Sequence, residues 1–206
     1  MKEKPIIFST QAVRAILDGR KTQTRRVIKP EWYRCLDFDE PEDINNALVQ
    51  CPYGQIGDRL WVRETWGAIS PDEELRPLSE CRIEYRADLP VGSTDYPGGW
   101  PADEAHGNDD APKWRSSIHM PRWASRITLE IVDVRVEKLQ NITCFDCTAE
   151  GVHYREVVKK QCTAFPQDYH RTFAELWDEI NAKRGYSWAS NPWVWVISFR
   201  SADKGN

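Results

Sequence analysis

The side chains best suited to chemistry lie in one short basic segment, Gly19-Arg20-Lys21-Thr22-Gln23-Thr24-Arg25-Arg26. Like charges near an amine disfavour its protonated form, so the arginines around Lys21 favour its action as a base. Thr24 supplies a hydroxyl, which is a weak nucleophile that needs such a base. In a regular strand Lys21 and Thr24 would face opposite sides, so we expect a turn or an irregular loop here. A solvated basic loop without chemistry is the alternative.

Two carboxylates could complete such a site. Glu64 is expected on the apolar face of a strand, where an unpaired charge is costly, so it should pair with an arginine or lie at the mouth of a barrel. Glu150 is expected at the end of a short helix, where a negative charge opposes the helix dipole. Each could equally be an ordinary salt-bridged acid. Which of the two meets Lys21 and Thr24 stays open.

A second segment, Trp114-Arg115-Ser116-Ser117-Ile118-His119-Met120-Pro121-Arg122-Trp123, mixes aromatic, cationic and hydroxyl side chains without helical or strand periodicity. Aromatic rings and arginines beside hydrogen-bonding groups are how proteins hold single bases. A packed loop that covers a barrel is the alternative. The side chains that we assign to binding of a nucleic acid or another ligand are Arg20, Arg25, Arg26, Arg63, Glu64, Trp66, Arg122 and Trp123.

The elements that position the N-terminal candidates follow from the apolar periodicity. Residues 6–8 form a short apolar strand, and Ser9 or Thr10 can cap a helix that ends at Gly19 in a left-handed conformation. Residues 59–66 alternate as a strand does, and residues 82–86 are expected to form another. Residues 30–57 contain turn chemistry and are expected to be irregular.

The C-terminal half is more regular. Residues 125–139 predict a long strand whose apolar phase slips, so a bulge is expected near Asp133. Helices are predicted for 144–150, ended by Gly151, and for 170–184, ended by Gly185. Residues 193–199 are apolar on both faces, which indicates a central or barrel-closing strand.

This order predicts an α+β fold around a small curved sheet or barrel, in a single domain over residues 1–206. Irregular insertions are expected at about residues 30–50 and 88–112. The second of these is rich in proline, glycine and acidic residues, and we expect it to be mobile or to act as a lid.

Composition narrows the classes of protein. The net charge of −4 argues against a protein that coats nucleic acid non-specifically, whereas the local basic segment suits a small anionic or nucleotide ligand. No run of roughly 18 apolar residues exists, so no transmembrane helix is expected. The N-terminal apolar run is too short for a signal peptide, and a cytoplasmic location is the default expectation.

The six cysteines are expected to be reduced thiols. Cys144 and Cys147 have the spacing of half a zinc knuckle, with His153, Cys162 and His170 downstream. A second Cys-x-x-Cys is missing from the sequence, so buried or incidental thiols are the better interpretation. We therefore expect neither a metal nor a cofactor.

The pattern Gly19-x-Lys21-Thr22-x-Thr24-x-Arg26 resembles the signature of the ASCH family, small domains of the PUA-like superfamily. Further segments that resemble this family, and its members in tailed phages and prophages, are Gly57-Asp58-x-Leu60-Trp61-Val62-Arg63-Glu64, Ala149-Glu150-Gly151, Trp177 with residues 193–199, Cys51-Pro52-Tyr53-Gly54 and residues 119–126. The resemblance implies a PUA-like β-barrel flanked by helices, with a cleft that meets RNA or a modified base.

One ASCH branch hydrolyses N4-acetylcytidine with a lysine, a threonine and a glutamate. The resemblance implies that Lys21 is a base or activates the nucleophile, that Thr24 is nucleophile or substrate anchor, and that Glu150 relays protons and holds the amine. The insertions could reshape the cleft, and Glu64 could replace Glu150.

Other ASCH branches are associated with RNA cleavage or bind nucleic acid without chemistry. The partners that the resemblance implies are therefore RNA, single-stranded nucleic acid or a modified nucleoside, inside a bacterial or phage-infected cell. The sequence leaves the oligomeric state open.

Overall fold

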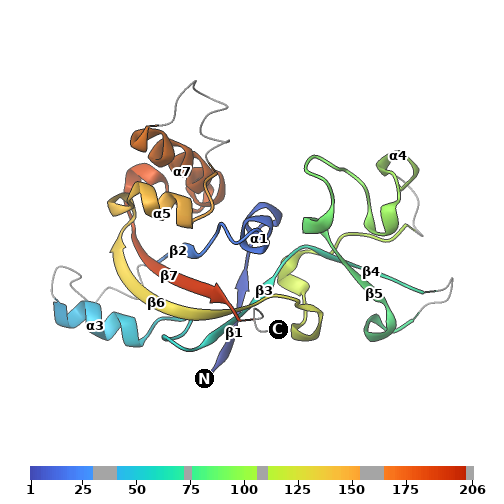
Figure 1. Cartoon of the computed structure of the whole chain (residues 1–206), viewed down its shortest axis with the longest axis horizontal. Helices are drawn as coiled ribbons and strands as arrows, with labels where there is room; N and C mark the ends of the chain where they lie inside the picture. Colours follow the sequence, from blue (N-terminus) through green and yellow to red (C-terminus); the bar gives the residue numbers. More distant parts are fainter. Residues whose placement is uncertain (30–40, 72–75, 106–110, 154–164, 203–206) are drawn as a thin grey trace. The chain divides into compact units, whose positions relative to one another are not determined.

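The structure is a computed structural model that describes residues 1–29, 41–71, 76–105, 111–153 and 165–202. Its strands are β1 (Glu3–Ile7), β2 (Gln23–Val27), β3 (Arg59–Arg63), β4 (Trp66–Ile69), β5 (Arg82–Tyr85), β6 (Thr128–Lys138) and β7 (Trp193–Ser201). Its α-helices are α1 (Thr10–Leu17), α3 (Pro41–Val49), α4 (Ala102–Ala105), α5 (Cys144–Ala149) and α7 (Pro166–Asn181), as Figure 1 shows. Short 3-10 turns are η1 (Leu78–Glu80), η2 (Arg86–Asp88), η3 (Pro97–Gly99), η4 (Ser117–His119), η5 (Arg122–Ala124), η6 (Leu139–Asn141), η7 (Ala182–Arg184) and η8 (Trp188–Ser190).

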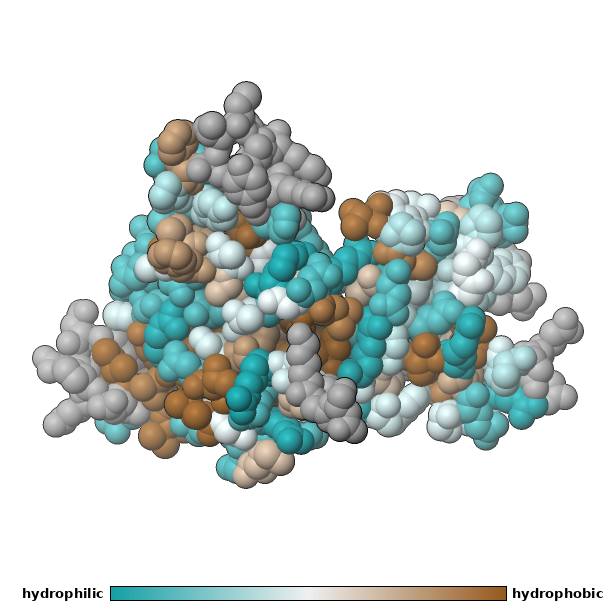
Figure 2. All heavy atoms as spheres, viewed as in Figure 1, coloured by the Kyte–Doolittle hydropathy of each residue, from teal (hydrophilic) through white to brown (hydrophobic). Residues whose placement is uncertain are grey.

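The chain divides into two compact units. Unit 1 comprises Met1–Lys4, Ala15–Leu60 and Leu129–Asn206, and unit 2 comprises Pro5–Arg14 and Trp61–Thr128. That the whole chain folds as one domain stays a prediction. In the view of Figure 2, hydrophilic side chains, in teal, interleave with smaller hydrophobic groups, in brown, over each unit.

A five-stranded sheet has the order β1-β3-β6-β7-β2. Strand β7 lies in the interior of the sheet, between β6 and β2, as its two apolar faces predict, and it pairs antiparallel with both. The register of β6 on β7 shifts between Ile131 and Asp133, so the predicted bulge is confirmed. Figure 1 shows that β6 and β7 curve together. The strands and helices together confirm the α+β class.

Helices α5 and α7 of unit 1 pack over the sheet (Figure 1). Their apolar side chains form one cluster with the strand β7, comprising Leu139, Ile142, Cys147, Val152, Phe173, Trp177, Val194 and Val196. A capping box begins α5, because the Thr143 side chain accepts from the Asp146 N–H while Asp146 accepts from the Thr143 N–H. Helix α7 begins four residues before the predicted start, since Pro166 suits the first helical turn.

Unit 2 holds the two-stranded sheet β4-β5. Its small core comprises Trp66, Met120 and Ala124.

The alternation predicted for residues 59–66 is present, since Leu60, Val62 and Glu64 are all buried. The prediction of one continuous strand is wrong, however: β3 ends at Arg63, and β4 belongs to the other sheet.

The two expected insertions are partly structured. Residues 41–49, predicted to be irregular, form helix α3, while residues 30–40 lie outside the described part. The acidic segment contains the turn η3 and the short helix α4, and residues 106–110 lie outside the described part. None of the helices that the structure describes is long and apolar enough to cross a membrane.

Candidate functional site

The backbone of unit 1 fixes the position of Lys21. Gly19 ends α1 with φ of +71°, as predicted for a left-handed helix end. The N–H groups of Arg20 and Lys21 both donate to the carbonyl of Ala15, each at 2.9 Å. The Thr22 N–H donates to the carbonyl of Ala149 at 2.8 Å, which ties the segment to the end of α5.

The expectation of an irregular loop holds only up to Thr22, because Gln23–Val27 is the regular strand β2. Lys21 precedes the strand, so strand alternation does not determine which way the Lys21 side chain points. Thr24 is buried and pairs with Ile197, which places its side chain on the face opposite to Arg25. By the same alternation, Thr24 shares its sheet face with Phe199.

Lys21 and Glu150 form a buried ion pair. The Lys21 Nζ lies 2.7 Å from the Glu150 Oε2 and also donates to the Glu150 backbone carbonyl at 2.8 Å. The two side chains are only 7% and 6% exposed. Glu150, rather than Glu64, is therefore the carboxylate that contacts Lys21.

The surroundings lower the pKa of Lys21. Burial disfavours the ammonium most strongly, and the charges of Arg26 and Arg25 add to this, while Glu150 opposes it. The net result is a pKa of Lys21 below the ordinary value of 10.5. A neutral amine is thus easier to reach at this position than at an exposed lysine.

Arg25 is enclosed by carboxylates. Its side chain is 0% exposed, and its guanidinium lies 3.3 Å from the Glu150 Oε1 and 3.5 Å from the Asp146 Oδ2. It also forms an ion pair with Glu137 and donates to the Gln23 Oε1 at 2.7 Å. In this structure Arg25 holds acidic side chains in place and does not face a ligand at the surface.

The other two arginines of the basic segment, Arg20 and Arg26, have different surroundings. Arg20 forms an ion pair with Asp18 at 2.9 Å and donates to the Gly151 carbonyl at 3.2 Å. Burial lowers the pKa of Arg26, and the nearby Tyr53 and Glu150 oppose that shift. Tyr53 therefore belongs to this neighbourhood, although the motif Cys51-Pro52-Tyr53-Gly54 does not by itself indicate it.

Glu64 belongs to a separate ion-pair group in unit 2. It is 1% exposed, and Arg126 contacts both of its oxygens, at 3.0 and 3.1 Å. Arg126 also lies 2.8 Å from the Asp88 Oδ1. The expected pairing of Glu64 with an arginine is confirmed, although burial still raises the pKa of Glu64.

The remaining residues assigned to ligand binding all lie in unit 2 and contact other tryptophan rings. They are Arg63, Trp66, Arg122 and Trp123. Trp66 is 1% exposed, and the ring of Trp123 meets it edge-on at 6.2 Å. The guanidinium groups of Arg63 and Arg122 lie 5.5 and 6.0 Å from the ring centre of Trp61. Trp123 is 53% exposed, so about half of this residue is open to solvent, whereas Trp66 is buried.

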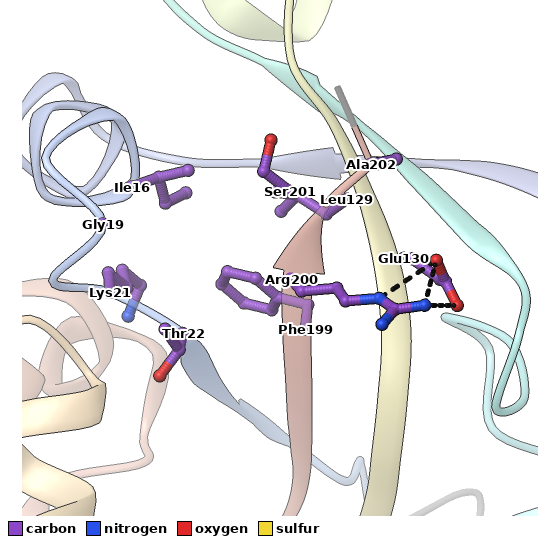
Figure 3. Close-up of a pocket in the computed structure, with 10 residues that line it drawn as sticks. All are labelled: Ile16, Gly19, Lys21, Thr22, Leu129, Glu130, Phe199, Arg200, Ser201 and Ala202. Atoms are coloured by element: carbon purple, nitrogen blue, oxygen red, sulfur yellow. Dashed lines mark hydrogen bonds and ion pairs between the residues drawn. The ribbon is translucent and has the colours of Figure 1, made fainter. Parts of the chain in front are cut away.

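A hollow of about 570 Å³ adjoins Lys21 in unit 1. Figure 3 shows Lys21 and Thr22 at one end, the ion pair of Arg200 and Glu130 at the other, and Phe199 between them. The other residues that line it are Ile16, Gly19, Leu129, Ser201 and Ala202. Its volume lies within the roughly 300–1,000 Å³ that is typical of small-molecule sites.

The cysteine pair of α5 contributes a core thiol. Cys147 is buried in the cluster under α7, and burial raises its pKa to about 12, so it stays a neutral thiol. Across the described part of the chain, no three acidic, histidine or cysteine side chains gather in a way that could hold a metal ion. Cys162 lies outside the described residues.

Comparisons with known proteins give one structural similarity. No protein-family model matches the chain, and no curated protein is significantly similar to it in sequence. A solved structure of the ASCH domain from Lactobacillus crispatus JV V101 is similar over 97% of this chain and 79% of that chain, with 11% sequence identity and a TM-score of 0.42. These values do not establish a shared fold.

Gly151 lets the glutamate and the lysine approach each other. It has φ of +96°, and a Cβ there would lie 3.1 Å from the Ala15 Cβ and 3.3 Å from the Lys21 Cβ. We expect Gly151→Ala to lower the free energy of unfolding by more than the roughly 1 kcal/mol that such a backbone conformation costs alone. Gly185→Ala is the matched control, since Gly185 has φ of +87° and open space around it. Equal losses in chemical denaturation would show that the crowding around Lys21 is unimportant.

Proposed function

We propose that the pair of Lys21 and Glu150 is the centre of an amidohydrolase that removes an acyl group from the exocyclic amine of a cytidine-like nucleoside. The observation that supports this most is the buried contact of 2.7 Å between a lysine of lowered pKa and a carboxylate, beside a hollow of about 570 Å³. The resemblance of the basic segment to the ASCH signature suggests the substrate.

In this proposal the neutral Lys21 amine takes a proton from the attacking hydroxyl group, either that of Thr24 or that of a water molecule. The oxygen attacks the acyl carbon, and the carbon–nitrogen bond of the amide breaks as the exocyclic nitrogen leaves. Glu150 passes the proton from Lys21 to that nitrogen, which leaves as a neutral amine. If Thr24 attacks, water then hydrolyses the acyl-threonine ester and restores the hydroxyl.

The developing oxyanion needs hydrogen-bond donors. The backbone N–H groups near Gly19 would be natural candidates, but the structure shows them in use. Gly19 donates to Ile16, Arg20 and Lys21 donate to Ala15, and Thr22 donates to Ala149. Arg26, which lies within electrostatic range of Glu150, is therefore our candidate for this role.

The test is turnover of N4-acetylcytidine by the purified protein, followed by liquid chromatography and mass spectrometry. We expect cytidine and acetate in equal amounts, with no added metal. Structured and single-stranded RNA are incubated in parallel, because the same pair could act as acid and base in RNA cleavage. Intact N4-acetylcytidine together with RNA fragments would replace the amidohydrolase proposal with a ribonuclease.

The protonation of Lys21 provides a test that does not depend on activity. By NMR of labelled lysine side chains, we expect one lysine to titrate below 10.5, and Glu150→Gln to lower its pKa further because the opposing charge is gone. The unfolded chain binds more protons between the folded and unfolded pKa values, so the free energy of unfolding should rise with pH in that interval. If no lysine had a pKa below 10.5, the role of Lys21 as a base would be contradicted.

A further inference from the structure

The threonine that lines the hollow beside Lys21 is Thr22. Thr22 is exposed, and Figure 3 shows it at the same end of the hollow as Lys21. Thr24, the other threonine of the basic segment, is 4% exposed and is not among the described residues that line the hollow. A small molecule in the hollow therefore meets the side chain of Thr22 rather than that of Thr24.

The backbone of Thr22 is held from two sides. Its N–H donates to the carbonyl of Ala149 at 2.8 Å, and its own carbonyl accepts from the N–H of Phe199 at 2.8 Å. The first bond ties Thr22 to the end of α5, next to Glu150, and the second ties it to β7. A β-branched side chain on a fixed backbone has few rotamers, so its hydroxyl is positioned before a ligand arrives.

The hydroxyl of Thr22 can donate a hydrogen bond to a ligand. Within the described part of the chain, no residue forms a hydrogen bond with this hydroxyl. Its O–H can rotate toward an acceptor in the hollow. By contrast, the backbone N–H groups of residues 19–22 all donate to carbonyls of the protein, and the Lys21 amine donates to Glu150. The side chain of Thr22 thus supplies a donor where the nearby backbone does not.

We infer that the Thr22 hydroxyl donates a hydrogen bond to the carbonyl oxygen of the acyl group that is removed. This bond strengthens as the oxygen gains negative charge, so Thr22 stabilises the transition state more than the bound substrate. Thr22 shares this task with Arg26. The inference rests on the proposed hydrolysis at Lys21 and Glu150, and it gives the donor role to a threonine other than Thr24.

The geometry favours a donor over a nucleophile at Thr22. A nucleophilic hydroxyl is activated by a base within hydrogen-bond reach. The Lys21 amine donates to the carboxylate and to the backbone carbonyl of Glu150, and within the described residues no hydrogen bond joins it to the Thr22 hydroxyl. A donor needs only an acceptor in the hollow, and the acyl oxygen of a substrate supplies one.

The first test is steady-state hydrolysis of N4-acetylcytidine by Thr22→Val, which keeps the shape of the side chain and removes the O–H. We expect kcat to fall about 10²–10³-fold, the range for loss of one oxyanion donor, with little change in KM. Thr22→Ser keeps a hydroxyl and should restore most of the rate. The matched control is Thr148→Val, at an exposed threonine in the same unit, and it should act like the wild type.

The second test does not require turnover. Threonine methyl groups are labelled for NMR in Glu150→Gln, where hydrolysis is expected to be slow, and the protein is titrated with N4-acetylcytidine or with cytidine. We expect N4-acetylcytidine to shift the Thr22 methyl signal more than cytidine does, because cytidine has no acyl oxygen. The Thr148 signal should stay in place with both.

Four outcomes would overturn the inference. These are equal kcat in Thr22→Val and the wild type, equal losses in Thr22→Ser and Thr22→Val, equal methyl shifts with the two nucleosides, and an acetyl group found on Thr22 by mass spectrometry, which would make Thr22 the nucleophile. Turnover that is unchanged in Thr22→Val removes this inference alone. A wild type that does not hydrolyse N4-acetylcytidine removes the proposed function, while an acyl-dependent shift at Thr22 would still support the contact.

Discussion

Replacing Arg25 by alanine is expected to lower the free energy of unfolding by about 3–5 kcal/mol, which is typical when one partner of a buried ion pair is removed. The guanidinium is fully buried, and it contacts the carboxylates of Glu137, Asp146 and Glu150. Without it, three acids that are each less than a fifth exposed would lie close together without their shared counter-ion. Urea denaturation of the variant at neutral pH measures the loss.

Arg200→Ala is the matched control, because Arg200 forms an exposed ion pair with Glu130 in the same unit. We expect this change barely to alter stability.

The pH dependence of stability provides a second check on the role of Arg25. Burial by itself would raise the pKa of Asp146, but hydrogen bonds from Thr143 and the charge of Arg25 hold that pKa below its ordinary value. The wild type therefore loses stability as pH falls through that lowered pKa. The loss should be smaller in Arg25→Ala, and identical acid dependence would contradict the role given to Arg25.

Replacing Glu150 by glutamine is expected to reduce kcat/KM for N4-acetylcytidine by about 10²–10⁴-fold, the range for loss of a general acid–base group. Glutamine keeps the size of the side chain and can still accept from the Lys21 amine, but it cannot relay a proton. The loss should therefore appear mainly in kcat rather than in KM. Steady-state kinetics on the purified variant, after its unfolding curve has been matched to that of the wild type, make the measurement.

Glu64→Gln distinguishes the two carboxylates. Glu64 is bound by Arg126 in unit 2 and is not the carboxylate that contacts Lys21. We expect the change to affect stability more than kcat. A loss of kcat as large as that of Glu150→Gln would show that the site contains the other acid.

Local chemistry made much of the fold predictable. The slip in apolar phase after Ile131 predicts the bulge. The glycines at 19, 151 and 185 end their helices as expected, and all three have positive φ, which was expected for Gly19. The strand at residues 59–66 was predicted too long, because alternation cannot show that Glu64 and Thr65 lie between two sheets. Helix α3 was missed because its sequence is polar and adjoins turn residues.

The candidate site was harder to predict than the elements that carry it. Lys21 and Glu150 are 129 positions apart, so the sequence motif named both residues but could not choose between Glu150 and Glu64. A basic run suggests an exposed surface, yet Arg25 is enclosed because its carboxylate partners come from β6 and from the end of α5. Such pairings depend on tertiary packing, which residue spacing does not encode.

The most direct test of the central claim is the rate of acetate release from N4-acetylcytidine by the wild-type chain and by Lys21→Ala, prepared side by side. The proposal predicts multiple turnovers by the wild type and a rate for Lys21→Ala that is at least about a hundredfold lower. No acetate release by a folded wild-type protein, or an equal rate in the two preparations, would contradict the assignment of Lys21 and Glu150 as a hydrolytic centre.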